Sequence, residues 1–200
     1  DSISCAYGNL AATYNEGNMT SRNTNALLGY HYLAAQELNA QINVQAHSGW
    51  GVYVNTSGDS GWGQWYNNYQ KLAYGKSATW DFNRYKADVV VINLGTNDRE
   101  GISKGNYKSD DFIKYYKQMI DGLMAKYGTD TKFVLCYGMM GRNSTVDADI
   151  ATVANSYGSN VQYLQFTNTN TNSMTGHPTQ ANHKASGKEL AARINAMRNN

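Results

Sequence analysis

Three polar side chains at distant points of the sequence could together carry out acyl transfer. Ser2 stands in the opening run DSIS, Asn97 follows an apolar run within GTND, and His177 stands in GHP near the other end. A serine can attack an ester carbonyl, a neutral imidazole can accept its proton, and an amide N–H can stabilise the oxyanion that forms. These residue types therefore predict a serine-dependent ester hydrolase.

Each of these residues alone also has an ordinary structural explanation. Ser is a good helix cap, so Ser2 could simply begin a helix. Gly, Asn and Asp form turns, so Asn97 could belong to a loop, and His177 could be a surface histidine before a helix. We expect the neighbouring Asp98 to hold its loop by accepting hydrogen bonds from backbone N–H groups. The combination in one chain is what favours the hydrolase.

The order of predicted elements indicates how these residues are positioned. Strand patterns occur at residues 41–46, 88–94, 132–137 and 161–166, and helical patterns at 24–39, 110–126, 145–157 and 180–197. Such alternation is typical of a parallel sheet with helices on both faces. We expect an α/β fold of three layers, α/β/α, around a central parallel sheet. A strand-to-helix turn at Ser2 and a strand ending before Asn97 would bring both to the carboxyl edge of the sheet, where open α/β folds bind ligands.

Two of the predicted helices have a clear apolar face. In the helix over 110–126, Ser109 is placed to cap the start and two aspartates stand in the first turn. Its expected inward residues are Phe112, Tyr116, Ile120 and Leu123. Those of the last helix are Leu190, Ile194 and Met197.

The stretch from Gly49 to Gly75 is crowded with glycine and asparagine and predicts a long irregular connection. Connections of this length in compact domains are more often functional than accidental. Trp50, Trp62 and Trp65 lie in it. Their rings could stack on sugars, although packing in the core is an equally good explanation for any one of them.

Composition excludes several classes of function. The 200 residues fit one domain, and a net charge of +2 from 17 basic and 15 acidic residues gives no basic face for nucleic acid. We therefore expect no nucleic-acid partner. No apolar run is long enough to span a membrane, so we expect no membrane partner either. Charged residues are only 16%, whereas Tyr, Asn, Gly and Ser are abundant, and this composition is typical of extracellular carbohydrate-active domains. The two cysteines, Cys5 and Cys136, predict buried thiols instead of a disulfide scaffold.

The same segments resemble a known superfamily. DSISCAYGN at 1–9, GTND at 95–98 and GHP at 176–178 resemble blocks one, three and five of the SGNH (GDSL-type) hydrolases, and AHSGWG at 46–51 is similar to block two. Within that superfamily, the run after the serine and the GHP ending most resemble carbohydrate esterase family 2. The resemblance spans nearly the whole chain in the expected order and implies the flavodoxin-like SGNH hydrolase fold.

The resemblance also implies roles for individual residues. Ser2 would be the nucleophile and His177 the base. The backbone N–H groups of Ser2 and Gly49, with the side-chain N–H of Asn97, would form the oxyanion hole. No cofactor is implied, and the sequence shows no spacing of metal ligands.

The usual third member of the triad is missing from its place. Most SGNH enzymes have an aspartate three residues before the histidine, but position 174 is Met and position 175 is Thr. Some acceptor must hold the imidazole in the correct tautomer, because the wrong tautomer can cost about 10⁴-fold in a triad enzyme. As in some family 2 relatives, we expect a backbone carbonyl in this role, which makes a Ser-His dyad.

The start of the chain departs from the superfamily pattern. There the nucleophile block follows directly on an apolar strand and a glycine, and here the sequence begins at Asp1 with neither. A true terminus would leave Ser2 on a fraying end and the sheet without its first strand. We therefore expect residues 1–200 to be one catalytic domain at the carboxyl-terminal end of a longer polypeptide. The upstream part would supply the missing strand and, as in family 2 relatives, a β-sandwich domain.

The predicted function is that of an extracellular O-deacetylase. It would release acetate from acetylated plant polysaccharides or oligosaccharides, as in xylan degradation. One alternative is a GDSL-type lipase or lysophospholipase, which would need a long apolar groove. The other is a carbohydrate-binding module with weak catalysis.

Overall fold

The computed structural model describes residues 1–11, 21–72, 77–172 and 175–198. Its helices are α1 (Tyr30–Glu37), α2 (Glu100–Ser103), α3 (Ser109–Tyr127), α4 (Ser144–Asn155) and α5 (Gln180–Arg198), with short 3-10 helices at Ser21–Asn23, Ala26–Leu28, Phe82–Arg84 and Gly158–Asn160. Its strands are β1 (Val89–Asn93), β2 (Lys132–Tyr137) and β3 (Val161–Gln165). In the described part of the chain, no helix is both long and apolar enough to cross a membrane.

The chain divides into two compact units. The first unit comprises Asp1–Gly49, Cys136–Asn143 and Leu164–Asn200. The second unit comprises Trp50–Leu135 and Ser144–Tyr163.

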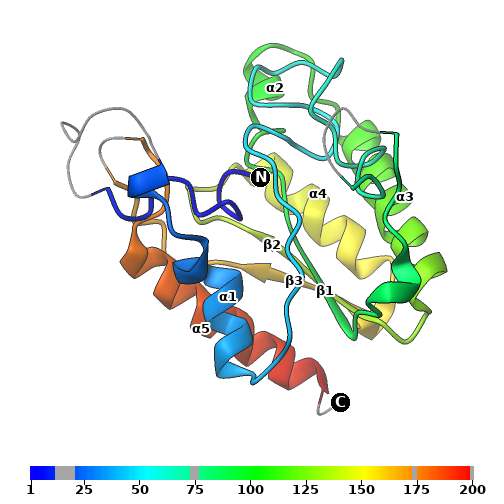
Figure 1. The fold of residues 1–200 in the computed structure, drawn as a ribbon. Helices are drawn as coiled ribbons and strands as arrows, with labels where there is room; N and C mark the ends of the chain where they lie inside the picture. The colour runs from blue at the N-terminus through cyan, green and yellow to red at the C-terminus, as the bar shows by residue number, and fades with distance from the viewer. Residues whose placement is uncertain (12–20, 73–76, 173–174, 199–200) are drawn as a thin grey trace. The chain divides into compact units, whose positions relative to one another are not determined.

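The three strands form one parallel sheet in the order β1-β2-β3 (Figure 1). Helix α3 connects β1 to β2 and helix α4 connects β2 to β3, because parallel neighbours need a crossover between them. In the central strand β2, the residues from Phe133 to Tyr137 are all buried, as expected where both faces of a sheet are covered. The predicted α/β class, with a parallel sheet flanked by helices, is confirmed. These three strands were predicted to within one residue at each end.

In the second unit, helices α3 and α4 pack against each other. Phe112, Tyr116 and Ile120 of α3 are buried as predicted. Leu123 is only half-buried, and Met119 is the fourth buried residue of the helix instead. Ser109 does not cap α3 but is its first residue, and no side-chain bond caps the helix start.

In the first unit, helices α1 and α5 pack against each other, as the blue and red ribbons of Figure 1 show. A Cβ atom at Gly187 of α5 would lie 3.0 Å from the backbone oxygen of Tyr30 in α1, so the missing side chain lets the two backbones approach. His183 of α5 is fully buried, and its Nδ1 accepts a hydrogen bond from the backbone N–H of Tyr30 at 3.1 Å. Leu190, Ile194 and Met197 are buried as predicted.

Two predicted elements differ from the structure. Residues 41–46 form no strand, because Val44 is 45% exposed and Ile42 only half-buried, so the alternation buries neither side of the segment. The helix predicted over 24–39 is limited to α1, preceded by two 3-10 turns. Gly29 lies between the 3-10 turn Ala26–Leu28 and α1, and its extended backbone (φ −73°, ψ 149°) interrupts the helix at that point.

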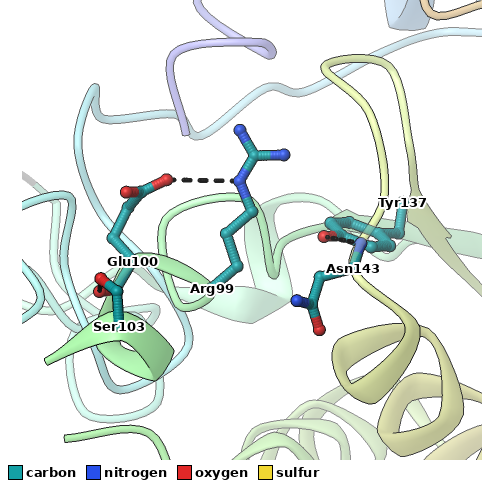
Figure 2. Close-up of polar contacts among 5 residues, drawn as sticks. All are labelled: Arg99, Glu100, Ser103, Tyr137 and Asn143. Atoms are coloured by element: carbon teal, nitrogen blue, oxygen red, sulfur yellow. Dashed lines mark hydrogen bonds and ion pairs between the residues drawn. The ribbon is translucent and has the colours of Figure 1, made fainter. Parts of the chain in front are cut away.

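The connection from β2 to α4 is closed by a tyrosine. The Tyr137 hydroxyl accepts a hydrogen bond from the backbone N–H of Asn143 at 3.1 Å (Figure 2). Gly138, with φ 121°, makes the turn in a region that favours glycine. Of the two cysteines in the chain, Cys136 is buried as predicted, whereas Cys5 is only partly buried.

The buried histidines of α1 and α5 predict that the stability of the fold depends on pH. Burial lowers the pKa values of His31 and His183, each to about 4, whereas a histidine in the unfolded chain titrates near about 6.5. Between these values the unfolded chain binds more protons at these two histidines, so their contribution to the free energy of unfolding falls as the pH falls from about 6.5 to 4. We expect each histidine to contribute on the order of 3 kcal/mol of this loss.

Urea denaturation at several pH values checks this expectation. The His183→Asn variant keeps an acceptor for the Tyr30 N–H and cannot be protonated, so it should lose on the order of 3 kcal/mol less stability than the wild type over this pH range. His47→Gln, at a partly exposed position, serves as the matched control and should behave as the wild type. Equal pH dependence in His183→Asn and wild type would contradict the assignment.

Candidate active site

Ser2 lies in a tightly turned segment of the first unit. Residues 2–10 form consecutive turns, so the strand-to-helix turn expected there is not observed. Asp1 shapes the start of the segment: its Oδ1 accepts from the backbone N–H of Ile3 at 2.9 Å and its carbonyl from that of Cys5 at 3.1 Å. These bonds fix the backbone on both sides of Ser2, whose side chain is only 5% exposed.

The structure brings Ser2 and His177 together. The Oγ of Ser2 and the Nε2 of His177 are 2.9 Å apart, and the Nδ1 of His177 is 2.9 Å from the backbone oxygen of Thr175. A carbonyl oxygen only accepts, so Nδ1 carries the ring proton and Nε2 accepts from the Ser2 hydroxyl. In this tautomer the imidazole can receive the serine proton when the hydroxyl attacks a carbonyl.

The surroundings of His177 keep its ring neutral. Burial lowers the pKa of His177 below its ordinary value, and the hydrogen bond to the Thr175 carbonyl opposes this in part by favouring the protonated ring. The ring of Tyr7 packs on the imidazole with 4.8 Å between ring centroids. A neutral imidazole at neutral pH is the form that a general base requires.

Gly49 belongs to the same unit as Ser2 and His177. Its φ of 79° lies in the left-handed region, where side chains other than hydrogen are strained. The backbone of the preceding Ser48 forms a hydrogen bond with Cys5, three residues beyond Ser2. The segment that carries Gly49 is therefore attached to the segment that carries Ser2. The proposed oxyanion donor at Gly49 is its backbone N–H, so the absence of a side chain does not remove it.

Asp98 organises a loop in the second unit, just past β1. Its carboxylate is fully buried and accepts three backbone hydrogen bonds, from Val52 at 2.8 Å and from Tyr53 and Val54 at 3.0 Å each. Burial raises the pKa of Asp98 to about 6, while the three N–H groups oppose the rise. The expectation that Asp98 is structural and holds its loop through backbone N–H groups is confirmed.

Asn97 also lies in the second unit and is 6% exposed. Its side-chain amide donates a hydrogen bond to the backbone oxygen of Trp50 at 2.8 Å. A primary amide has two N–H donors, so Trp50 uses one of them. Its role as an oxyanion donor stays a prediction.

The three tryptophans singled out in the sequence differ in exposure. Trp50 and Trp65 are 3% and 7% exposed and pack on each other with 5.0 Å between ring centroids. Trp62 is 47% exposed, and its backbone oxygen accepts from the side chain of Asn55 at 3.0 Å. Stacking on a sugar needs an exposed ring face, which Trp62 offers.

An ion pair between partly exposed side chains, which contributes little to stability, follows Asp98. The Nε of Arg99 pairs with the Oε1 of Glu100 at 3.3 Å, and both side chains are partly exposed (Figure 2). The Ser103 hydroxyl donates to the backbone oxygen of Glu100 at 3.1 Å and closes the short helix α2. Within the described residues, no group of three or more His, Cys, Asp and Glu side chains could hold a metal ion.

The acceptor for His177 could be expected from the sequence but not located in it. Every residue has a backbone carbonyl, so nothing in the sequence distinguishes Thr175 from its neighbours. Asn172, whose side chain accepts two hydrogen bonds from Thr175, was also missed. It stands in the run NTNTN (168–172), where five alternating polar residues give no signal for one of them.

Comparisons with known proteins cover most of the chain. Residues 34–200 match the sequence profile of a family described as "Protein of unknown function (DUF459)". The chain is 31% identical over 204 residues to "Cellulase/esterase CelE" of Acetivibrio thermocellus, a match that covers 97% of this chain and 24% of that protein. The chain thus spans only part of this curated relative.

Solved structures of other proteins have a fold similar to that of this chain. A family two carbohydrate esterase from Clostridium thermocellum, in complex with cellohexaose, is 29% identical with a TM-score of 0.87, and the match covers 100% of this chain and 62% of that one. An acetyl xylan esterase from Butyrivibrio proteoclasticus is 19% identical with a TM-score of 0.84, covering 100% of this chain and 63% of that one. The second likeness is one of fold alone.

The loop around Asp98 is packed so closely at Gly51 that adding one methyl group there should destabilise the fold. A Cβ atom at Gly51 would lie 1.9 Å from the Val54 backbone oxygen and 2.5 Å from the Asp98 carboxylate, whereas nothing lies within 4 Å of a Cβ atom at Gly61. We expect Gly51→Ala to lower the free energy of unfolding by about 3 kcal/mol and Gly61→Ala, the matched control, to change it by less than about 0.5 kcal/mol. Chemical denaturation measures both, and equal effects would contradict this account of the loop.

Proposed function

The chain belongs to the family described as "Protein of unknown function (DUF459)" and has the SGNH-type hydrolase fold of carbohydrate esterase family 2, and we propose that it is a serine esterase that removes acetyl groups from carbohydrates. The observation that carries this proposal is the chain of hydrogen bonds from the Ser2 hydroxyl through His177 to the Thr175 carbonyl. It supplies a nucleophile, a neutral base and an orienting acceptor in one place.

In the proposed reaction, the Oγ of Ser2 attacks the acetyl carbonyl carbon while its proton passes to the Nε2 of His177. The backbone N–H groups of Ser2 and Gly49 stabilise the oxyanion of the tetrahedral intermediate. The bond to the sugar oxygen then breaks, and that oxygen takes the proton from His177. Water then attacks the acetyl-serine while losing a proton to the same imidazole. The bond between the acetyl carbon and Oγ breaks, Oγ takes the proton back from His177, and acetate leaves.

A backbone carbonyl in place of the usual aspartate has a chemical consequence. The Thr175 oxygen fixes the ring and its tautomer, but it has only a partial charge. The imidazolium formed during each proton transfer is therefore less stabilised than it would be beside a carboxylate. The proposal is thus a Ser-His dyad rather than a triad.

The surroundings of Ser2 favour a small acyl group. Its side chain is 5% exposed, and the imidazole against its hydroxyl is itself covered by Tyr7. This low exposure of the nucleophile supports a small acyl group, so acetyl is the group we propose, in preference to the fatty acyl group of a lipase.

For the alcohol part of the substrate we propose an oligosaccharide or polysaccharide. The relative from Clostridium thermocellum that was crystallised with cellohexaose supports a sugar ligand for this fold. The exposed ring of Trp62 is suited to stack on one. We further propose that the protein acts outside the cell on acetylated plant polysaccharides such as xylan.

Release of acetate tests the proposed activity. We expect the protein to release acetate from acetylated xylan or glucomannan and from short p-nitrophenyl esters, with little action on long-chain esters. Faster cleavage of long-chain esters would identify a lipase. Binding to unacetylated glucan with no turnover of any ester would identify a binding module.

The dyad predicts which side chains the reaction needs. Ser2→Ala and His177→Ala should each lower kcat by about 10³-fold or more, because each acts in the transition state. Neither should change the melting temperature greatly, since neither side chain belongs to the apolar core. Ser4→Ala, which removes only a hydrogen bond to the Tyr30 hydroxyl, is the matched control and should retain kcat. A loss of less than about tenfold in either dyad variant would contradict the assigned roles.

A further inference from the structure

The side chain of Asn172 forms hydrogen bonds with Thr175 and His177, and the residue is 6% exposed. The Oδ1 of Asn172 accepts two hydrogen bonds from Thr175, one from its backbone N–H and one from its hydroxyl, both at 2.9 Å. The Nδ2 donates to the backbone oxygen of His177 at 3.0 Å and to that of Gly8 at 3.3 Å. Both ends of the amide are therefore used, and all four bonds go to the loop of His177 or the segment of Ser2.

Thr175 passes this constraint on to the imidazole. Its hydroxyl donates to Asn172 and accepts from the backbone N–H of His177 at 3.2 Å. The backbone of Asn172 adds two more bonds: its N–H donates to the oxygen of His177 at 2.8 Å, and its oxygen accepts from Gly176 at 3.0 Å. The N–H and the hydroxyl of Thr175 are both held, and so is the N–H of Gly176, which shares a peptide plane with the Thr175 carbonyl. The carbonyl is thereby fixed toward Nδ1 of His177.

The contact with Gly8 attaches the same asparagine to the nucleophile's segment. Gly8 follows Tyr7, whose backbone N–H donates to the oxygen of Ser2 at 3.1 Å. The backbone N–H of Gly8 is itself held by the hydroxyl of Thr24 at 3.0 Å. Asn172 thus lies between the two segments whose separation sets the distance from Oγ to Nε2.

We propose that Asn172 is a positioning residue that fixes the tautomer and orientation of His177 through Thr175, the task that a carboxylate performs directly in a Ser-His-Asp triad. This inference rests on the proposed roles of Ser2 and His177. Asn172 touches neither the reacting oxygen nor the ring, so it acts on the reaction only through the position of the Thr175 carbonyl and of the Gly8 segment.

The hydrogen-bond pattern requires an amide at this position. Aspartate has nearly the same shape and would keep the two bonds from Thr175. It would also place a buried carboxylate oxygen against the carbonyl oxygens of His177 and Gly8, where the amide now donates. Two favourable contacts would become repulsive, and a charge would be buried without a cation. Asn172→Asp is therefore expected to be as harmful as Asn172→Ala.

The tautomer of His177 can be measured without any substrate. In the full chain labelled with ¹⁵N-histidine, the ring nitrogen shifts at neutral pH distinguish an Nδ1–H imidazole from an Nε2–H one, and the His177 signals are those missing from His177→Ala. We expect a single Nδ1–H form in the wild type and a mixture in Asn172→Ala and Asn172→Asp. Asn168→Ala, which removes a hydrogen bond of Asn170 in the same loop, is the matched control and should match the wild type.

Turnover of an acetyl ester supplies the second measurement. We expect Asn172→Ala to lower kcat on the order of 10²-fold with KM changed by less than about twofold, because the variant displaces the base and leaves the sugar contacts alone. Thr175→Val should lower kcat by about 3- to 10-fold through loss of one hydroxyl, and Thr175→Ser, which restores it, should return kcat close to the wild type.

The outcomes separate this inference from the proposed function. A folded Asn172→Ala protein with the wild-type tautomer of His177 would overturn the inference, whatever its kcat. If the wild type releases no acetate at all, the proposed function fails, and the tautomer measurement still decides the role of Asn172. If Asn172→Ala does not fold, equal tautomer mixtures in Thr175→Val and Thr175→Ser would overturn the inference, and rescue by Thr175→Ser would support it.

Discussion

The chemistry available to this protein depends on one partly buried imidazole that stays neutral and keeps its proton on the correct nitrogen. Burial supplies the first condition, because a charged ring is costly away from water, and it acts on His177 in the same direction as on His31 and His183. The Thr175 carbonyl supplies the second, because it can only accept. Nε2 is then left as an acceptor for the hydroxyl of Ser2.

Each compact unit contains an irregular loop that is held in one conformation by a buried polar side chain. Loops lack the regular backbone hydrogen bonds of helices and sheets, yet their buried N–H and C=O groups still need partners. In the second unit, the carboxylate of Asp98 collects three consecutive backbone N–H groups. In the first unit, the amide of Asn172 serves N–H, hydroxyl and carbonyl groups at once. An anion suffices where only donors must be satisfied, whereas an amide is needed where donors and acceptors meet.

The sequence predicted those parts of the fold in which a local pattern decides the structure. Strand β2 was placed correctly because its apolar run is continuous, and α3 because its buried residues recur at helical spacing. The segment 41–46 shows the limit, since two apolar residues in alternation do not make a strand when neither is buried. Likewise Gly29 ends a helical pattern through its backbone conformation, which composition alone did not show.

For the site, Ser2 and His177 were selected by the segments in which they stand, DSIS and GHP, and the structure places their side chains 2.9 Å apart. The sequence was not enough to locate the Thr175 carbonyl or the amide of Asn172, since backbone carbonyls and asparagines are common in this chain and only the folded loop distinguishes these two. The fold predicted from the resemblance, that of the SGNH hydrolases of carbohydrate esterase family 2, is confirmed.

Covalent labelling of the serine tests the central claim most directly. A fluorophosphonate reacts with a serine whose hydroxyl is activated by a neighbouring base, and mass spectrometry of the digested protein locates the adduct. The account predicts one adduct, on Ser2, formed rapidly in the wild type and at least about 10²-fold more slowly in His177→Ala. An adduct on another serine, or labelling of Ser2 at an equal rate without His177, would contradict it.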